Sequence, residues 1–310
     1  MLNAIAERVS TAIVFPGQGT QAPGMGTPWR DRPEWTLVVE RAEAALNEPL
    51  GRLLLDADAD ELARTRNAQL AVLLTSLVVW EAIKARVDPV GFAGHSLGQV
   101  SALIAVGVFD FDDGIRFAAI RAERTQAAAD ATPGMMAALL GATLEQAEAG
   151  CLAAPDSCWI ANDNAPGQVV LAGTPEGLAA GSAAAKDAGA RTARPLSVGG
   201  AFHTPLMQSA ADALGADLAG VTLHAPSAPV VSNDDGHAYV DAEGWRARSA
   251  RHVAVPVVWR LVQPTLVELG ATQLLEVGHG TMLAALAKRT IPGVPVLGVA
   301  QPEDIDAAVS

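Results

Sequence analysis

One serine in this sequence has the surroundings of an enzyme nucleophile. Ser96 lies in the stretch GHSLG, with Gly94 two residues before it and Gly98 two residues after it. The apolar run before it predicts a strand and the run after it predicts a helix, which is the context of a nucleophile elbow. The first amide groups of that helix, near Leu97, would point at the same spot. The pattern predicts covalent catalysis by Ser96, and the alternative is a glycine-rich turn without chemistry.

A nucleophilic serine needs a base, and six histidines are available. His95 adjoins the serine, and neighbouring side chains on a tight turn point apart, so His95 is expected to be structural. His224 and His237 stand in polar segments typical of exposed loops. His203, in GGAFHTPLM, follows a Gly–Gly turn and precedes an apolar helix, which would hold it rigidly near a sheet edge. His203 is therefore the candidate base.

A third element follows the first apolar run of the chain. The stretch FPGQGTQ, from Phe15 to Gln21, contains a Gly-Gln-Gly turn whose backbone N–H groups could bind an oxyanion. It lacks the Gly-Lys-Ser/Thr ending that a phosphate-binding loop requires. The alternative is an ordinary loop between a strand and a helix.

Composition and charge exclude several classes of partner. The chain has 310 residues, of which half are hydrophobic, and its formal net charge is −13. It has no long basic run, so nucleic acid and anionic membranes are not expected partners. The longest apolar run, Leu70 to Trp80, is too short to span a bilayer. Glu7 and Arg8 interrupt the start of the chain where a signal peptide would be apolar, so a cytoplasmic protein is expected. The only two cysteines, Cys151 and Cys158, are expected to be reduced.

Strand and helix patterns alternate along most of the chain, which predicts an α/β protein with helices on both faces of a parallel sheet. The expected strands include TAIVFPG, PVGFAGHS, ATQLLEVGHG and VPVLGVA. Helices are expected from about Pro33 to Leu46, from Asn67 to Val87, and over GQVSALIAVGV.

The pattern changes between about Ala131 and Gly200. Four short strand candidates and two helices, roughly Thr143–Ala153 and Pro175–Ala188, follow one another in the order βαββαβ. This order is typical of a ferredoxin-like α+β domain. We therefore expect a large domain of residues 1–130 and 201–310 with a small inserted domain of residues 131–200.

Six motifs together resemble one enzyme family. They are FPGQGTQ, GHSLGQ, RAERTQ, NAPGQVVLAG, AFHTPLM and PVVW, and they follow the order and spacing of the malonyl-CoA:acyl carrier protein acyltransferase family from about Ile13 to Leu297. This family includes the acyltransferases of polyketide synthases. The resemblance implies an α/β-hydrolase-like large domain with a ferredoxin-like insert, and a monomer. It also implies no metal and no bound cofactor.

The activity that the resemblance implies is transfer of a malonyl or related dicarboxylic acyl group from coenzyme A to an acyl carrier protein. The acyl group would pass through an ester on Ser96 to the phosphopantetheine thiol of the carrier, in polyketide or fatty acid biosynthesis. His203 would be the general base, and the N–H groups of Gln18 and Leu97 the oxyanion hole. Arg121 in RAERTQ would pair with the free carboxylate of malonyl, which suits a planar guanidinium.

The resemblance also implies residues that line the acyl pocket. Asn162, in IANDNAPGQ, matches a family asparagine of the pocket, and Asn164 is an alternative match. Phe202 stands just before His203, where phenylalanine goes with malonyl and serine with methylmalonyl. The ring occupies space that an α-methyl group would need, and one methyl group changes binding by only about 1–3 kcal/mol. Malonyl is the expected acyl group.

Four positions depart from the family pattern, one of them Thr125, which replaces a commoner methionine near the pocket. Gln99 stands where the family usually has glutamate, close to the expected substrate site. His252 stands where many members have glutamine, whose main-chain carbonyl orients the catalytic histidine; a carbonyl survives the substitution, so Ser96 and His203 should need no aspartate. His279 replaces a common proline and is expected to be structural.

Two other functions remain open from the sequence. An esterase or editing thioesterase could use the same scaffold, although hydrolases of this kind normally add an acid between the serine and the histidine. A non-catalytic carrier-binding protein would not need the serine, histidine and arginine together. Carrier proteins are generally acidic, so a transferase would need a local basic docking surface, with these candidates: Arg191, Arg194, Lys288 and Arg289.

Overall fold

The apolar run Thr11–Phe15 forms β1, near the middle of a six-stranded sheet in the order β10-β9-β1-β2-β7-β8. The structure, a computed structural model, describes residues 9–309, so Glu7 and Arg8 lie outside the described residues. Neighbouring strands are parallel from β10 to β7, and β8 is antiparallel to β7. The bounds of the other strands are β2 (Gly91–Gly94), β7 (Val230–Val231), β8 (Ala238–Tyr239), β9 (Gln273–Val277) and β10 (Val296–Val299).

Helices cover both faces of this sheet. Successive residues of β1 point to opposite faces and both sets are apolar, so each face needs a covering layer. Ile13 and Phe15 face a large core, and Ala12 and Val14 face a smaller one. The large core includes residues of α5 (Thr65–Ile83), α6 (Gly98–Ala105), α7 (Phe111–Ala131) and α10 (Gln208–Leu218). The smaller core includes residues of α12 (Trp259–Glu268) and α13 (Met282–Thr290).

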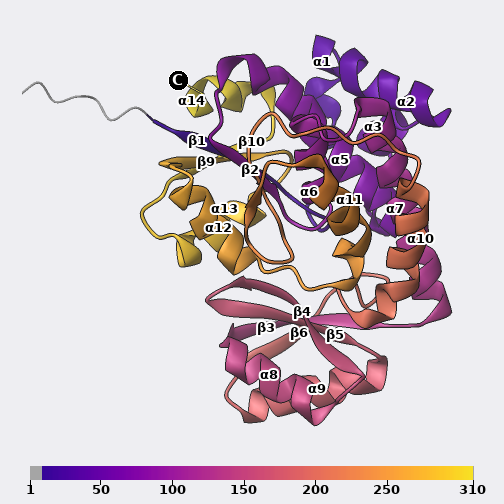
Figure 1. The fold of residues 1–310 in the computed structure, drawn as a ribbon, viewed down its shortest axis with the longest axis vertical. Coiled ribbons are helices and arrows are strands. Elements are labelled where there is room, and N and C mark those ends of the chain that lie inside the picture. Colours follow the sequence, from indigo (N-terminus) through magenta and orange to yellow (C-terminus); the bar gives the residue numbers. More distant parts are fainter. Residues whose placement is uncertain (1–8, 310) are drawn as a thin grey trace, which may run out of the picture.

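Shorter elements complete the larger part of the molecule (Figure 1). They are η1 (Thr27–Trp29), α1 (Pro33–Trp35), η2 (Thr36–Glu40), α2 (Arg41–Leu46), α3 (Gly51–Leu55), α4 (Ala59–Ala63), η3 (Lys84–Arg86), η4 (Pro205–Met207), α11 (Ala242–Arg251), η5 (His252–Ala254), η6 (Pro302–Asp304) and α14 (Ile305–Ala308). The helix expected from Pro33 to Leu46 is thus three consecutive pieces, with a π-helical turn in η2. A π turn holds one more residue than an α turn, and the apolar pattern alone does not reveal it.

The helix α5 is the most apolar element of the chain. Together with η3 it is long and apolar enough to cross a membrane, but 72% of its most apolar window is buried inside the protein. Its buried side chains pack in the large core. We therefore interpret it as the central helix of a globular fold.

A second, four-stranded sheet is formed by the chain between Met135 and Pro195. Its strand order is β4-β5-β3-β6 and all its neighbouring strands are antiparallel. Two helices cover its outer face, at the bottom of Figure 1, and pack on Leu139 and Leu171. The elements, in chain order, are β3 (Met135–Ala142), α8 (Leu144–Ala153), β4 (Cys158–Ala165), β5 (Gly167–Gly173), α9 (Pro175–Asp187) and β6 (Thr192–Pro195).

The chain order βαββαβ and the sheet order both define a ferredoxin-like unit. Local signals fix its helices: Thr143 and Gln146 form a capping box at α8, and Thr174 caps α9 with Pro175 in the first turn. The predicted fold class, an α/β-hydrolase-like parallel sheet with a small ferredoxin-like unit, is confirmed.

The inner face of the small sheet packs against the larger part. Met136 and Val170 lie in an apolar cluster with Ala201 and with the partly buried Phe202. At the edge strand β4, the N–H of Asp163 donates to the Val257 carbonyl and the N–H of Val257 donates to the Ala161 carbonyl, each at 2.9 Å. These contacts fix β4 beside the segment that follows η5.

Candidate active site

The turn between β2 and α6 has the geometry of a nucleophile elbow. Ser96 has a φ of +52°, a left-handed conformation that non-glycine residues rarely adopt. A Cβ atom on Gly94 would lie 1.8 Å from the Gly98 carbonyl oxygen, and one on Gly98 would lie 2.2 Å from the Phe15 carbonyl oxygen. Both positions therefore require glycine, as the sequence pattern predicts.

His203 lies beside the serine, although 107 positions separate them in the chain. The Ser96 Oγ and the His203 Nε2 are 2.7 Å apart. The His203 Nδ1 lies 3.0 Å from the carbonyl oxygen of His252 and 3.2 Å from that of Val255. A carbonyl can only accept, so Nδ1 carries the proton and Nε2 is free to accept the serine proton.

The environment keeps His203 neutral. Burial, the positive charge of Arg121 and the neighbouring His95 together lower the pKa of His203 from 6.5 to about 3, against the two carbonyl contacts that raise it. A neutral imidazole is the form that can take a proton from Ser96. Within the described residues no carboxylate is hydrogen-bonded to Nδ1, so the arrangement is a pair without a third, acidic member.

Arg121 on α7 brings a positive charge to the same place. Its side chain is buried, with 4% of the residue exposed, and its Nη2 lies 3.4 Å from the Ser96 Oγ. Across residues 9–309 no acidic side chain pairs with it. Burial lowers the pKa of Arg121 to about 10, so the guanidinium stays protonated at neutral pH. A buried cation without an anion is costly, so this guanidinium has the chemistry to pair with a carboxylate.

Gln69 orients this arginine, a contact that the sequence did not reveal. The Arg121 Nη1 donates to the Gln69 Oε1 at 2.5 Å, and the Gln69 Nε2 donates to the Thr125 Oγ1 at 3.4 Å. Gln69 is buried in the middle of α5. Its amide inside the apolar stretch NAQLAVLLT is the one sequence signal that could have identified it, because buried polar groups need a partner.

The loop after β1 lies against the elbow. A Cβ atom on Gly17 would lie 2.4 Å from the carbonyl oxygen of His95. In the part of the chain that the structure describes, neither the Gln18 N–H nor the Leu97 N–H donates a hydrogen bond. Gln18 follows Gly17 and Leu97 follows the serine, and two unpaired donors of this kind have the chemistry of an oxyanion hole.

Strand β4 carries both asparagines that are candidates for the pocket. The Asn164 Oδ1 lies 2.8 Å from the His95 Nε2, so Asn164 is engaged by the histidine of the elbow. The Asn162 side chain is buried and makes no hydrogen bond with residues 9–309, which leaves its amide free for a ligand. Between them, Asp163 pairs with Arg260 at 2.7 Å.

The remaining predicted site residues surround His203 and the elbow. Phe202 is partly buried against the inner face of the small sheet. The His252 ring centroid is 5.6 Å from that of His203, and its buried Nε2 has no partner among the described residues. Gln99 is buried on α6 and its Oε1 accepts hydrogen bonds from Asn233, so its amide oxygen is engaged within the protein.

The other histidines lie as the sequence suggested. His224 and His237 are exposed, and His224 lies 3.4 Å from Asp110. His95 is buried and its ring contacts Trp259 edge-on. Burial lowers the pKa of His95, so this ring is neutral as well.

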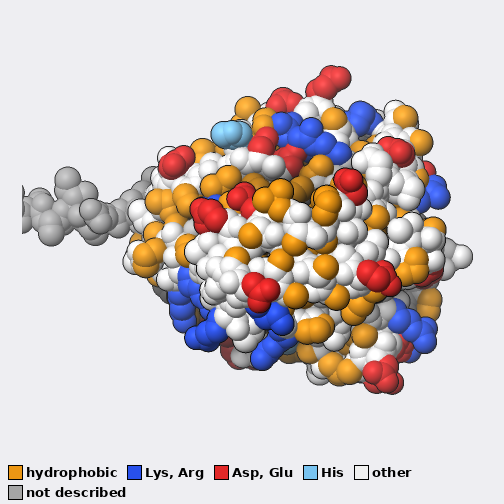
Figure 2. Space-filling model, turned by 90° about the horizontal axis from the view of Figure 1, so that it is seen from below, with side chains coloured by type: hydrophobic (Ala, Val, Ile, Leu, Met, Phe, Trp, Pro, Cys, Tyr) orange, Lys and Arg blue, Asp and Glu red, His pale blue; other side chains and the backbone are white. Residues whose placement is uncertain are grey.

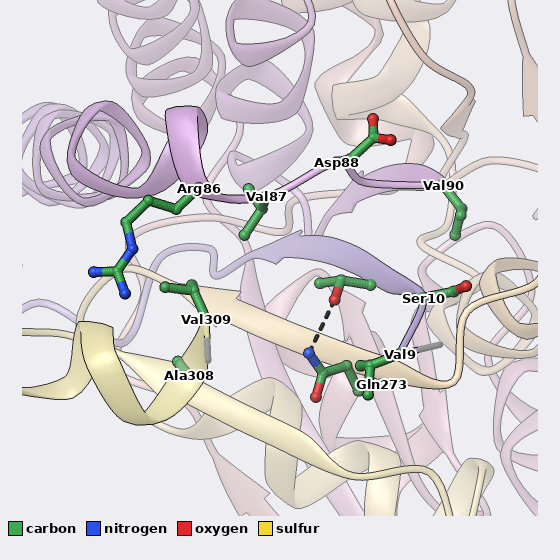
Figure 3. Close-up of a pocket in the computed structure, with 10 residues that line it drawn as sticks. Val9, Ser10, Arg86, Val87, Asp88, Val90, Gln273, Ala308 and Val309 are labelled. Atoms are coloured by element: carbon green, nitrogen blue, oxygen red, sulfur yellow. Dashed lines mark hydrogen bonds between the residues drawn. The ribbon is translucent and has the colours of Figure 1, made fainter. Parts of the chain in front are cut away.

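A hollow of about 350 Å³ lies at the opposite, amino-terminal edge of the large sheet (Figure 3). It is lined by the starts of β1 and β9, where the Gln273 side chain donates to the Thr11 hydroxyl at 2.9 Å. None of the predicted site residues lines it. Ligands of open α/β sheets bind at the carboxyl ends of the strands, where Ser96 lies, so this hollow is not the candidate site. Within residues 9–309 no cluster of three or more His, Cys, Asp or Glu side chains could hold a metal.

Comparison with known proteins agrees with this chemistry. Residues 12–293 match the acyl transferase domain family, and the chain belongs to that family. Among its relatives are two malonyl CoA-acyl carrier protein transacylases. The protein from Bacillus subtilis is 34% identical over 96% of both chains, and that from Escherichia coli K12 is 36% identical over 96% of this chain and 98% of its own.

Solved structures of similar proteins have the same fold. A malonyl-transacylase in complex with the holo form of its type II polyketide synthase acyl-carrier protein has a TM-score of 0.92 at 34% identity, over 97% of this chain and 99% of its own. An acyl-carrier-protein S-malonyltransferase from Burkholderia pseudomallei 1710b has a TM-score of 0.92 at 35% identity over the same shares. The alternative of a dedicated hydrolase finds no support in these comparisons.

Proposed function

We propose that this enzyme transfers a malonyl group from coenzyme A to the phosphopantetheine thiol of an acyl carrier protein. One observation carries the choice of acyl group: the unpaired, buried Arg121 guanidinium lies 3.4 Å from the Ser96 hydroxyl. An acyl group on Ser96 with a carboxylate at its far end would pair with that cation. An uncharged acyl group would leave the cation buried and unpaired.

The proposed reaction has two half-steps with the same base. His203 takes the proton of Ser96 as its oxygen attacks the thioester carbonyl, and the oxyanion binds the N–H groups of Gln18 and Leu97. The tetrahedral intermediate collapses, coenzyme A leaves as the thiol with the proton from His203, and malonyl remains as an ester on Ser96. The pantetheine thiol of the carrier then gives its proton to His203 and attacks the ester carbonyl. The second tetrahedral intermediate collapses, the bond between the acyl carbon and the Ser96 Oγ breaks, and Ser96 leaves with the proton from His203. Proton and acyl group balance over the two steps, so no cofactor takes part.

Two residues complete the proposed pocket. The free side-chain amide of Asn162 faces no partner in residues 9–309 and could bind polar atoms of the acyl group or the pantetheine. The ring of Phe202 takes up space beside His203, which favours malonyl over a branched acyl group. His252 contributes its carbonyl oxygen to hold the base.

Four exposed cations are the proposed docking surface for the acidic carrier. The Arg191 N–H donates to the Leu140 carbonyl at 3.1 Å, and the Arg289 guanidinium donates to the Gln168 amide at 3.4 Å. Leu140 and Gln168 are register partners, so the two arginines lie at the same end of the small sheet. Figure 2, seen from the side of the small sheet, shows Lys and Arg side chains gathered at the lower left of this face. The full set is Arg191, Arg194, Lys288 and Arg289.

The domain bounds, the oligomeric state and the cellular location are also proposals. We propose a large domain of residues 1–130 and 201–310, an inserted domain of residues 131–200, a monomeric state and a cytoplasmic location. Nucleic acid and membranes are not proposed as partners, since the net charge is −13.

Intact-protein mass spectrometry tests the proposal directly. The enzyme and a Ser96→Ala variant are incubated briefly with acetyl-, malonyl- or methylmalonyl-CoA and then chased with a holo carrier protein. We expect a malonyl adduct that requires Ser96 and moves to the carrier. An adduct that decays to free acid at the same rate with and without carrier would instead identify an editing hydrolase.

A further inference from the structure

A buried asparagine just after β7 bonds to the backbone of the nucleophile and to the backbone two residues before it. We propose that Asn233 is a positioning residue that fixes the backbone of Ser96, and that Gln99 acts through Asn233 instead of contacting the substrate. The inference rests on the proposed role of Ser96 as nucleophile. It assigns a function to two side chains that touch no reacting atom.

The contacts of Asn233 hold the strained turn. Its Oδ1 accepts a hydrogen bond from the Ser96 N–H at 2.8 Å, and its Nδ2 donates to the Gly94 carbonyl at 2.7 Å. Asn233 is fully buried, with 0% exposed. The left-handed φ of Ser96 costs of order 1 kcal/mol and persists only when the surroundings determine it. These two bonds, at positions two residues apart on the elbow, hold Ser96 in this conformation.

Gln99 sets which way the Asn233 amide points. Its Oε1 accepts from the Asn233 Nδ2 at 2.8 Å and from the Asn233 N–H at 3.2 Å. An acceptor on that side requires the NH₂ group of Asn233 to face it, which leaves the amide oxygen toward the Ser96 N–H. Gln99 is 3% exposed, and its Nε2 has no partner among the described residues. Only the oxygen of Gln99 is therefore used.

The same segment also supports the base. The Asn233 carbonyl accepts from the Val258 N–H at 2.7 Å, and the next residue, Asp234, accepts from the Arg251 guanidinium at 2.9 Å. The chain between Arg251 and Val258 contains the two carbonyl groups that bind the His203 Nδ1. Residues 233 and 234 thus fix both ends of that segment. Loss of the Asn233 side chain would release the serine while leaving this main-chain contact in place.

Loss of the Asn233 side chain should lower the rate of reaction at Ser96 more than it weakens binding of malonyl-CoA. Misplacement of a reacting atom by about 1 Å can reduce a rate roughly 100-fold, and loss of supporting hydrogen bonds around a site typically costs about 10–100-fold. Arg121 lies on α7 and makes no hydrogen bond with Asn233, so binding of the malonyl carboxylate should be preserved.

The test measures the reactivity of Ser96 with phenylmethylsulfonyl fluoride, a neutral serine reagent, alongside malonyl loading from malonyl-CoA. We expect Asn233→Ala to lower both rates about 10–100-fold, with KM for malonyl-CoA changed less than about twofold. Gln99→Leu should lower both rates in the same way but less. Gln99→Glu keeps an acceptor oxygen and replaces the unpartnered Nε2 with a second carboxyl oxygen, so it should retain most of the activity that Gln99→Leu loses.

Matched controls separate positioning from general destabilisation. Gln263→Leu removes another fully buried amide, on α12, and Ser101→Ala removes an unpartnered hydroxyl two residues after Gln99 on α6. Both should keep the sulfonyl fluoride rate of the wild type in the folded fraction. If Gln99 acts only through Asn233, the double variant Asn233→Ala/Gln99→Leu should be no slower than Asn233→Ala.

Two results would overturn the inference. One is an Asn233→Ala enzyme that is less stable but reacts with the sulfonyl fluoride as fast as the wild type once folded. The other is a Gln99→Glu enzyme whose rates of sulfonyl fluoride reaction and malonyl loading are as low as those of Gln99→Leu. If Asn233→Ala does not fold, the comparison of these two Gln99 variants decides the question. A wild type that reacts with the reagent at Ser96 but never loads malonyl would refute the proposed function alone.

Discussion

The Nη2 of Arg121 and the Oγ of Ser96 lie 3.4 Å apart, so a buried positive charge stands beside the proposed nucleophile. The same charge has two effects. It offers a partner to a carboxylate at the far end of an acyl group, and it lowers the pKa of His203, after burial the largest cause of that shift. In the proposed mechanism, substrate choice and the protonation of the base are therefore linked through one residue.

Removal of this charge should change the acyl preference. Arg121→Met should lower kcat/KM for malonyl-CoA roughly 100-fold or more, because a charge-assisted pair contributes about 3 kcal/mol. Loading from acetyl-CoA should be unchanged or faster. Both rates are measured by stopped incubation and intact-protein mass spectrometry. Arg116→Met, on the exposed face of the same helix, is the matched control and should load malonyl normally. Equal losses with malonyl- and acetyl-CoA would contradict the proposed clamp.

The acid limb of the pH profile of kcat/KM should lie well below the pH at which an ordinary histidine titrates. His203 must be neutral to act as a base, and its pKa is lowered to about 3. We expect kcat/KM for malonyl-CoA to stay flat as pH falls through 6.5, and to decrease only in more acidic solution. In Arg121→Met the decrease should begin at higher pH, because a positive charge beside the imidazole is lost. A wild-type profile that is half-maximal near pH 6.5 would show that His203 is not so strongly desolvated.

Three buried histidines should make the fold sensitive to acid. Burial lowers the pKa values of His95, His203 and His252 in the folded state, whereas in the unfolded chain they titrate near 6.5. The unfolded state therefore binds more protons below pH 6.5, so their contribution to stability is complete above that pH and is lost as the pH falls below it. Each histidine can contribute up to about 1.4 kcal/mol per pH unit to the slope.

The variant His252→Gln isolates one of these contributions. Urea unfolding between pH 8 and pH 5 should give a shallower pH dependence of the free energy of unfolding for the variant, by up to about 1.4 kcal/mol per pH unit below pH 6.5. His224→Gln is the control, since His224 is exposed and its replacement should leave the slope unchanged. The same slope for wild type and His252→Gln would mean that His252 is protonated in the folded protein.

Local patterns predicted the elbow and the two sheets because their causes are local. Gly94 and Gly98 are required by contacts within the turn and with β1, and the capping box at Thr143 lies within one helical turn. His203 could be ranked above the other histidines from its neighbours. Its pairing with Ser96 was a hypothesis from this ranking and from the family motifs, since no local rule joins positions that are 107 residues apart.

The contacts that the sequence did not reveal join distant positions. Gln69 meets Arg121 across 52 positions, and Asn233 meets Ser96 across 137. Gln69 lies in an apolar segment and Asn233 in an irregular one, and no neighbouring residue in the sequence indicates which side chain or backbone group either would contact. The π-helical turn of η2 was missed for a different reason, because one extra residue in a turn leaves a helical apolar pattern recognisable.

A smaller residue at position 202 should admit a branched acyl group. Phe202→Ser should raise the ratio of methylmalonyl to malonyl loading by roughly 5- to 150-fold, which corresponds to about 1–3 kcal/mol for one methyl group in a pocket. The two thioesters are presented together and the adducts are distinguished by mass. Phe202→Leu, which frees less space, should give a smaller change in the same direction. An unchanged ratio in both variants would mean that the ring does not contact the α-carbon of the acyl group.

Reversal of the exposed cations at the end of the small sheet should weaken docking of the carrier. Each exposed ion pair contributes about 0.2–1 kcal/mol, so Arg191→Glu/Arg194→Glu should raise KM for the carrier roughly 5- to 30-fold through lost attraction and added repulsion. KM for malonyl-CoA should not change, and added salt should reduce the difference.

Lys84→Glu/Arg86→Glu alters the net charge equally at the amino-terminal edge of the large sheet and is the control. Equal increases in KM for the carrier in both double variants would assign the effect to overall charge. If Arg191→Glu/Arg194→Glu alone raised KM equally for the carrier and for malonyl-CoA, these arginines would act at the acyl site and not in carrier docking.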